Sequence, residues 1–129
     1  MTQLTARKIA EANFGKWAQA VEQGDPKRVT ALFSEDAVFL PTLSGSLVCT
    51  LEGTEEYFQH FLGKAPVCKL TEDEVRVLSD DVYCHAGIYA FELTDGDRRI
   101  DLDARFSFIW SCESGSWRIL HFHSSLMPS

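Results

Sequence analysis

The chain has 129 residues, the usual length of one compact domain. Hydrophobic residues make up 45% of it and charged residues 24%, and no apolar run approaches the roughly 20 residues of a membrane-spanning helix. The formal net charge of -7 argues against binding to the phosphate backbone of nucleic acids, which depends on clustered lysine and arginine.

The start of the chain does not resemble a secretory signal, because Arg7, Lys8 and Glu11 occupy the place of the required apolar segment. We therefore expect a cytoplasmic protein with one domain over residues 1–129. The cysteines form no C-x-x-C pair, so we expect free thiols and neither a metal site nor a cofactor. They are Cys49, Cys68, Cys84 and Cys112.

The N-terminal part of the chain predicts two helices. Apolar residues recur at helical spacing from Thr5 to Gln23, and Gly24 follows at the position of a C-terminal cap. Asp25 and Pro26 then supply an N-cap and a first-turn proline for a short second helix. This helix is expected to bury Val29, Leu32 and Phe33 and to end at Ser34-Glu35-Asp36.

The middle of the chain predicts a short hairpin and a third helix. The segments Ala37–Leu40 and Leu47–Leu51 have strand composition and flank a loop that contains proline, serine and glycine. Helical spacing returns in Thr54–Leu62, and Gly63 and Pro66 end this helix.

The remaining chain predicts three long strands. Turns are expected at Ser79-Asp80-Asp81, at Thr94-Asp95-Gly96-Asp97 and around Glu113-Ser114-Gly115. Helices followed by a run of strands indicate an α+β fold, in which the helices cover one face of a curved antiparallel sheet.

Two strands differ in how many apolar faces they carry. In Arg99–Cys112 the even-numbered residues are apolar and the odd-numbered ones mostly polar, so the even face is expected to point to the core. The strand Val82–Leu93 is apolar on both faces. A second cover is therefore expected, and in a chain of this length a second subunit is the best candidate, which predicts a homo-oligomer.

The last strand carries the most informative motif, His121-Phe122-His123, preceded by Trp117-Arg118-Ile119 and followed by serines and Pro128-Ser129. This ending resembles the association (hub) domain of calcium/calmodulin-dependent protein kinase II and its bacterial stand-alone relatives, within the NTF2-like superfamily. The resemblance extends to Ala104–Trp110 and Glu52–Phe58 and, more loosely, to the N-terminal helix.

The resemblance implies an NTF2-like cone, with one long and two shorter helices on the sheet, oligomerisation through the outer sheet face, and a pocket between sheet and helices. Arginines in the kinase pocket match Tyr89, Phe108 and Ser124 of this chain, so the expected ligand is small and weakly polar. The predicted pocket residues are Tyr57, Tyr89, Phe108, Trp110 and Ser124. Kinase activity is not implied, because the chain has no Gly-rich loop, H-R-D or D-F-G motif.

A polar cluster is predicted on the face away from the core. A three- or five-residue loop around Ser114 would align odd with odd residues across the last hairpin. The cluster would then comprise Asp103, Arg105, His121, His123 and Ser125. It can be read as a hydrogen-bonded network at a subunit interface or as a pH-sensitive or anion-binding site. The two histidines could also bind a metal if a third ligand were near, but the sequence places none there.

Catalysis is considered from the residues, because enzymes are common on this fold. Ketosteroid isomerase-like members carry a base before a proline on the first strand, where this chain has Leu40 before Pro41. Glu35, Asp36 and the pair Asp101 and Asp103 are expected to be solvated.

Three functions therefore stay open. The first is a homo-oligomeric association-type domain with a ligand pocket. The second is an isomerase, cyclase or hydrolase of the SnoaL type, acting on a small hydrophobic metabolite. The third is a non-catalytic adaptor that docks onto another protein.

Overall fold

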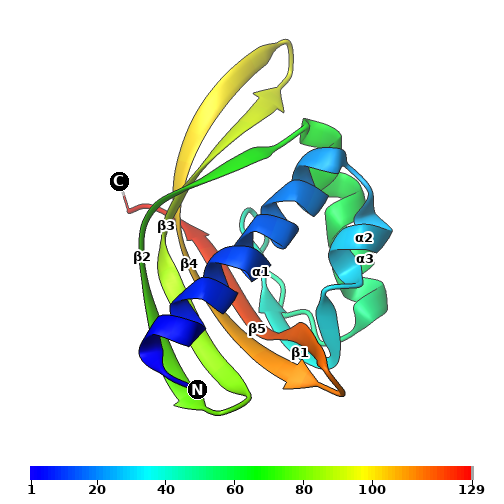
Figure 1. Ribbon diagram of the computed structural model, residues 1–129. Helices are drawn as coiled ribbons and strands as arrows, with labels where there is room; N and C mark the ends of the chain where they lie inside the picture. Colours follow the sequence, from blue (N-terminus) through cyan, green and yellow to red (C-terminus); the bar gives the residue numbers. More distant parts are fainter. Residues whose placement is uncertain (129) are drawn as a thin grey trace.

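The computed structural model describes residues 1–128, in which three α-helices pack against a five-stranded sheet (Figure 1). The helices are α1 (Gln3–Gln23), α2 (Pro26–Thr30) and α3 (Leu51–Phe61), and one 3-10 turn, η1 (Leu62–Lys64), follows α3. The strands are β1 (Phe33–Leu40), β2 (Val67–Ser79), β3 (Val82–Asp95), β4 (Arg98–Glu113) and β5 (Ser116–Leu126).

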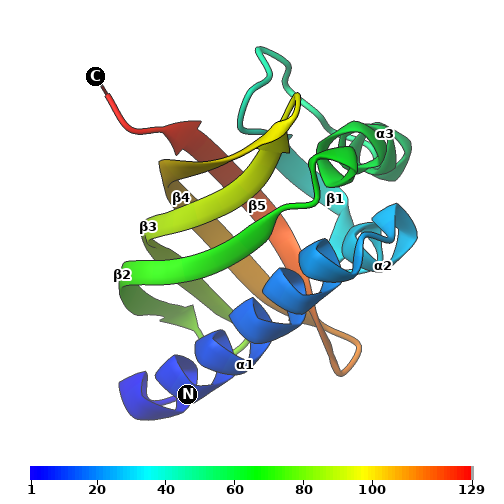
Figure 2. The ribbon, with the colours of Figure 1, turned by 90° about the horizontal axis from the view of Figure 1, so that it is seen from above.

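The strands lie in the order β1-β5-β4-β3-β2, with β1 parallel to β5 and all other neighbours antiparallel. The sheet is curved, and the helices gather on one of its faces (Figure 2). The predicted α+β fold is thereby confirmed. None of the described helices is both long and apolar enough to cross a membrane.

Side-chain caps set where the helices begin. The hydroxyl of Thr2 accepts the N–H of Thr5 at 3.1 Å, so α1 begins at Gln3, two residues before the predicted start. At its other end Gly24 adopts a φ of 80°, as the cap prediction requires. The hydroxyl of Thr50 accepts the N–H of Gly53 at 3.0 Å, and α3 therefore begins at Leu51.

The predicted hairpin in the middle of the chain is wrong in two respects. The segment Leu47–Leu51 forms no strand and contributes only one bridge, between Val48 and Phe39. Strand β1 is longer than predicted, because it already begins at Phe33 and includes Ser34-Glu35-Asp36. The reason is its long-range parallel pairing with β5, which local sequence does not reveal.

The prediction of three long strands after α3 is also wrong, since four strands alternate with the three predicted turns. The strand that the prediction missed is β2. It lies at the sheet edge, and its pairing with β3 shifts register between Leu70 and Glu72. This β-bulge inverts the side-chain alternation, so no single period of two runs through the strand.

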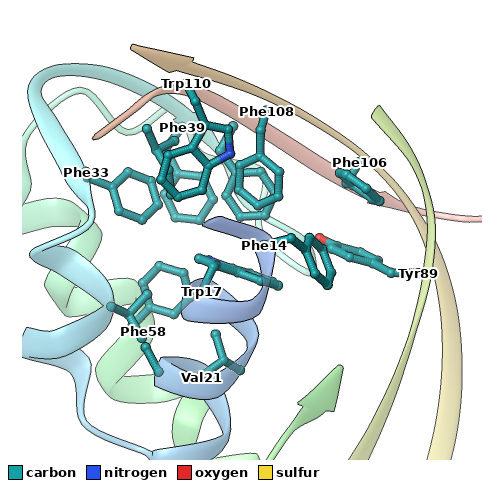
Figure 3. Packing of buried hydrophobic residues seen from close by; sticks show 14 of the residues in the cluster. Phe14, Trp17, Val21, Phe33, Phe39, Phe58, Tyr89, Phe106, Phe108 and Trp110 are labelled. Atoms are coloured by element: carbon teal, nitrogen blue, oxygen red, sulfur yellow. The ribbon is translucent and has the colours of Figure 1, made fainter. Parts of the chain in front are cut away.

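The core between α1 and the sheet is aromatic (Figure 3). Trp17 of α1 stacks on Tyr89 of β3, with ring centroids 5.9 Å apart. Its ring also makes edge contacts with Phe108 of β4 and Phe122 of β5, each at 5.4 Å. One helix residue thus contacts three neighbouring strands, which fixes α1 across the inner face of the sheet.

Gly87 of β3 lies where the bulged strand β2 approaches most closely. A Cβ atom at this position would lie 2.0 Å from the carbonyl oxygen of Glu72 and 2.8 Å from the Cα of Asp73. Both atoms belong to backbone and cannot turn away. The bulge and the glycine therefore depend on each other.

We predict that Gly87→Ala lowers the free energy of unfolding by about 2–3 kcal/mol, because the backbone must shift to admit the methyl group. Gly15→Ala is the matched control. No atom lies within 4 Å of a Cβ at Gly15 in the middle of α1, so this variant should be about 0.5–1 kcal/mol more stable than the parent. Chemical denaturation measures both, and equal effects would contradict the close approach at Gly87.

Candidate functional site

The outer face of the sheet is the first candidate site. In β3 the odd-numbered residues are mostly buried, whereas the even-numbered residues on the opposite face are half-buried: Cys84, Ala86, Ile88 and Ala90. Ile109 of β4 pairs with Cys84 and lies on the same face. No helix in residues 1–128 covers this face, so its apolar centre stays in contact with solvent in the single chain.

The even-numbered residues of β4 are buried from Ala104 to Trp110, as predicted, while the intervening odd-numbered residues are half-buried or exposed. Arg105 pairs with Ser125, and Ser107 pairs with His123. The register thus places the predicted polar cluster on the outer face.

The turn behind this register differs from the prediction. Only Ser114 and Gly115 connect β4 to β5, with φ angles of 51° and 84°, so the loop has two residues and not three or five. Such a loop aligns odd with even residues. A bulge next to Ile109 and His121 then restores the predicted pairing of odd with odd.

The two histidines of the cluster differ in exposure. His123 is exposed, whereas His121 is half-buried. Partial burial and, secondarily, the nearby His123 lower the pKa of His121. In residues 1–128 no three histidine, cysteine or carboxylate side chains come together in an arrangement suited to a metal ion.

The interior of the cone is the second candidate site. The hydroxyl of Tyr57 donates to the carbonyl oxygen of Thr42 at 2.6 Å, the Thr42 hydroxyl bonds to that of Ser124, and the Ser124 hydroxyl bonds to that of Tyr89. The hydroxyl groups of Thr42, Ser124 and Tyr89 thus form one hydrogen-bonded chain, and Tyr57 joins it through the backbone carbonyl of Thr42. Burial raises the pKa of both tyrosines, so they stay neutral.

A cavity of about 10 Å³ lies beside these hydroxyl groups, enough for about one water molecule. Of the predicted pocket residues, Tyr57 and Tyr89 border it, whereas Phe108, Trp110 and Ser124 are buried and do not. Trp17 lines the cavity, and its indole Nε1 is buried without a hydrogen-bond partner in residues 1–128. Binding of a larger ligand requires side chains to move and stays a prediction.

A partly buried ionic network joins α1 to the sheet, and the sequence did not predict it. The guanidinium of Arg7 donates to both carboxylate oxygens of Asp73 on β2, at 2.7 and 2.8 Å. The Nε2–H of His85 on β3 donates to the same carboxylate at 2.7 Å. His85 is 0% exposed, and its other ring nitrogen has no partner in the described chain.

The bulge in β2 explains why this network was hard to foresee. It turns Asp73 to the inner face, although the residue lies in a charged stretch that reads as solvated. A carboxylate beside an imidazole is a familiar arrangement for proton transfer. However, the cavity in the cone borders neither Asp73 nor His85, and His85 has no surface exposed to solvent, so a substrate cannot reach its ring in this conformation.

The other acidic candidates stay apart from the cone. Leu40, at the position of the isomerase base, is half-buried on β1, and Glu35 and Asp36 on the same strand are exposed. Asp101 and Asp103 are exposed on β4. These carboxylates lie at the surface, as expected.

The family model for the calcium/calmodulin dependent protein kinase II association domain matches residues 6–128. A crystal structure from Xanthomonas campestris, provisionally assigned as such an association domain, is 39% identical to this chain, with 95% of this chain and 88% of that chain covered and a TM-score of 0.92. No curated protein matches the sequence.

Two more distant structures share the fold. The association domain of the Caenorhabditis elegans kinase is 17% identical, with 95% of this chain and 97% of that chain covered and a TM-score of 0.79. An NTF2-like protein with a cystatin-like fold from Novosphingobium aromaticivorans is 11% identical, with 98% and 84% covered and a TM-score of 0.79.

We predict that acid destabilises the fold through His85 and Asp73. Burial lowers the pKa of His85 below the ordinary histidine value of about 6.5. As the pH falls below 6.5, the unfolded chain therefore takes up a proton on this imidazole before the folded chain does. The bonds from Arg7 and His85 lower the pKa of Asp73 against the effect of burial, which gives a second loss below about pH 4. Stability should therefore fall as the pH drops below 6.5 and again below 4.

Denaturation at several pH values tests this. His85→Gln should flatten the loss that begins near pH 6.5, leaving a smaller slope from His121. His60→Gln, an exposed residue on α3, should keep the slope of the parent. An unchanged slope in His85→Gln would refute the assignment.

Proposed function

The chain belongs to the calcium/calmodulin dependent protein kinase II association domain family and has its NTF2-like cone fold, and from this premise we propose that it is a self-associating domain without kinase activity of its own. Its contact surface is the outer face of the sheet. The observation that carries the proposal is the apolar centre of this face, formed by Cys84, Ala86, Ile88, Ala90 and Ile109.

Three features support this surface over the rest of the molecule. Its centre is made of small and apolar side chains on neighbouring strands, which permit a second sheet to approach to the usual spacing of about 10 Å. Arg105 on its border makes no ion pair within residues 1–128 and can meet a carboxylate of a second chain. The helices already cover the opposite face.

The alternatives from the sequence have less support. An enzyme would need an ionisable group that substrate can reach inside the cone, and in residues 1–128 the small cavity is lined by aromatic and hydroxyl side chains. For an adaptor, no described surface favours a different protein over a second copy.

We predict that Ile88→Asp converts the assembly to monomers, because it places a carboxylate at the apolar centre of the contact. The loss should be about 3 kcal/mol or more of association free energy, the scale for a buried unpaired charge. Size-exclusion chromatography with light scattering at micromolar concentration measures the mass. Leu4→Asp is the control, since Leu4 is 67% exposed on α1, and this helix lies on the inner side of the sheet.

Either of two results would contradict the proposed contact surface. If the parent is a monomer at all accessible concentrations, or if Ile88→Asp associates like Leu4→Asp, the outer face is not the contact surface.

A second candidate role is binding of a small, neutral ligand in the cone. The observation that favours it is that Trp17, whose buried indole Nε1 has no hydrogen-bond partner in residues 1–128, lines the same cavity as Thr42, Tyr57 and Tyr89. A ligand with an apolar ring and one hydroxyl group would satisfy this donor and replace a contact of the chain. Among residues 1–128, no charged group lines the cavity to balance an anion.

We predict that benzyl alcohol shifts the amide resonances of Thr42, Tyr57 and Ser124, and that benzoate, which has the same ring with a charge, does not. Burying the unpaired carboxylate would cost too much free energy. Heteronuclear NMR titration measures both, and Ser124→Ala should weaken the response to the alcohol. Equal responses to the two probes, or shifts confined to other residues, would contradict this role.

A further inference from the structure

The outer face of the sheet carries its charges in rows that run across the strands. The strand register places Lys69 of β2, Ala90 of β3 and Asp103 of β4 side by side. Lys69 and Asp103 are both exposed and lie on either side of the small residue. This first row therefore has a cation at its β2 end and an anion at its β4 end.

The next row repeats the arrangement with the signs exchanged. Glu72 of β2 pairs with Ile88 of β3, which pairs with Arg105 of β4. Glu72 and Arg105 are exposed, and Ile88 between them is half-buried.

A third row also carries glutamate on β2. Glu74 of β2 lies beside Ala86 of β3, followed by Ser107 of β4 and His123 of β5. In these three rows the β2 side carries Lys69, Glu72 and Glu74, and the other side carries Asp103, Arg105 and His123. Arg76 of β2, beside Cys84, follows on the same face.

The two ends of a row cannot neutralise each other within one chain. They are two or three strands apart, or about 10–15 Å in the hydrogen-bonding direction of the sheet. Within residues 1–128, Lys69, Glu72, Asp103 and Arg105 form no ion pairs, and Glu74 forms one with exposed Arg76. These side chains can therefore meet partners of opposite charge only on another surface.

A second copy of the same chain supplies them in one simple orientation. A two-fold axis in the plane of contact, parallel to β3, places each row over the same row of the partner with its ends exchanged. Lysine then faces aspartate in the first row and glutamate faces arginine in the second. In the third row Glu74 faces Ser107, and His123 lies one strand further out. The residues of β3 near the axis include Cys84, Ala86, Ile88 and Ala90, which leave room for close contact. Glu92, further along the same face, forms an ion pair with Arg99 of its own chain.

We infer that the partner of this face is a second copy in this orientation, and that Glu72 of each chain pairs with Arg105 of the other. The inference rests on the proposed self-association and specifies its geometry. An axis perpendicular to the strands through the second row would instead place Glu72 on Glu72 and Arg105 on Arg105, which like-charge repulsion disfavours.

Charge exchange between two chains tests the pairing. Glu72→Lys and Arg105→Glu should each weaken dimerisation by at least about 10-fold, because each creates two like-charged contacts per dimer. An equimolar mixture of the two variants should regain the affinity of the parent, since a heterodimer has Lys facing Glu at one contact and Arg facing Glu at the other. Sedimentation velocity measures the dissociation constants, and far-UV circular dichroism checks that both exposed substitutions leave the fold intact.

The mixture also separates this orientation from others. If the axis instead ran across the strands between the first two rows, Lys69 would face Glu72 and Asp103 would face Arg105. The mixed dimer would then keep one contact between two lysines and one between aspartate and glutamate, and its affinity would stay low. Suppose that the parent dimerises and that Ile88→Asp dissociates it. If the mixture of the two charge variants then fails to regain the affinity of the parent, only the proposed orientation is overturned. A monomeric parent would overturn the proposed function itself.

Discussion

Strand β3 is apolar on both faces, and the helices can cover only one of them. Tyr89 and its inward neighbours are buried under α1, where Trp17 stacks against the strand. Ile88 and its outward neighbours keep part of their surface in water. Because exposure of contiguous apolar surface is unfavourable, this strand connects the fold of the single chain to its proposed association.

Two β-bulges decide which side chains reach each face. The bulge in β5 compensates for a two-residue turn and brings His121 and His123 to the outer face, opposite Phe122 and its core contacts. The bulge in β2 turns Asp73 inward to Arg7 and His85. The same bulge leaves Glu72 and Glu74 outside. The inward position of Asp73 and the outward positions of Glu72 and Glu74 therefore share one cause.

The sequence predicted those features that depend on local chemistry or on one uninterrupted period. Gly24 ends α1, and the even-numbered residues of β4 are buried, as expected. The features it missed depend on long-range pairing. Strand β1 is extended by β5, and β2 is a charged edge strand with a shifted register, so neither shows a clean alternation. The partnership of Asp73 and His85 needed that register to be known. The predicted pocket residues follow the same division, since Tyr57 and Tyr89 border the cavity but Phe108 packs into the core.

The central claim is that the outer face forms a contact between chains, and a native residue allows it to be tested. Cys84 lies half-buried at the centre of this face, and Cys49 is exposed in the segment before α3. Alkylation of each thiol, followed by mass spectrometry over a range of protein concentrations, reports on the face without any substitution. The account predicts that alkylation of Cys84 slows as the concentration rises through the dissociation constant, while that of Cys49 does not change. A rate for Cys84 that is independent of concentration, in a sample that sedimentation shows to be associated, would contradict it.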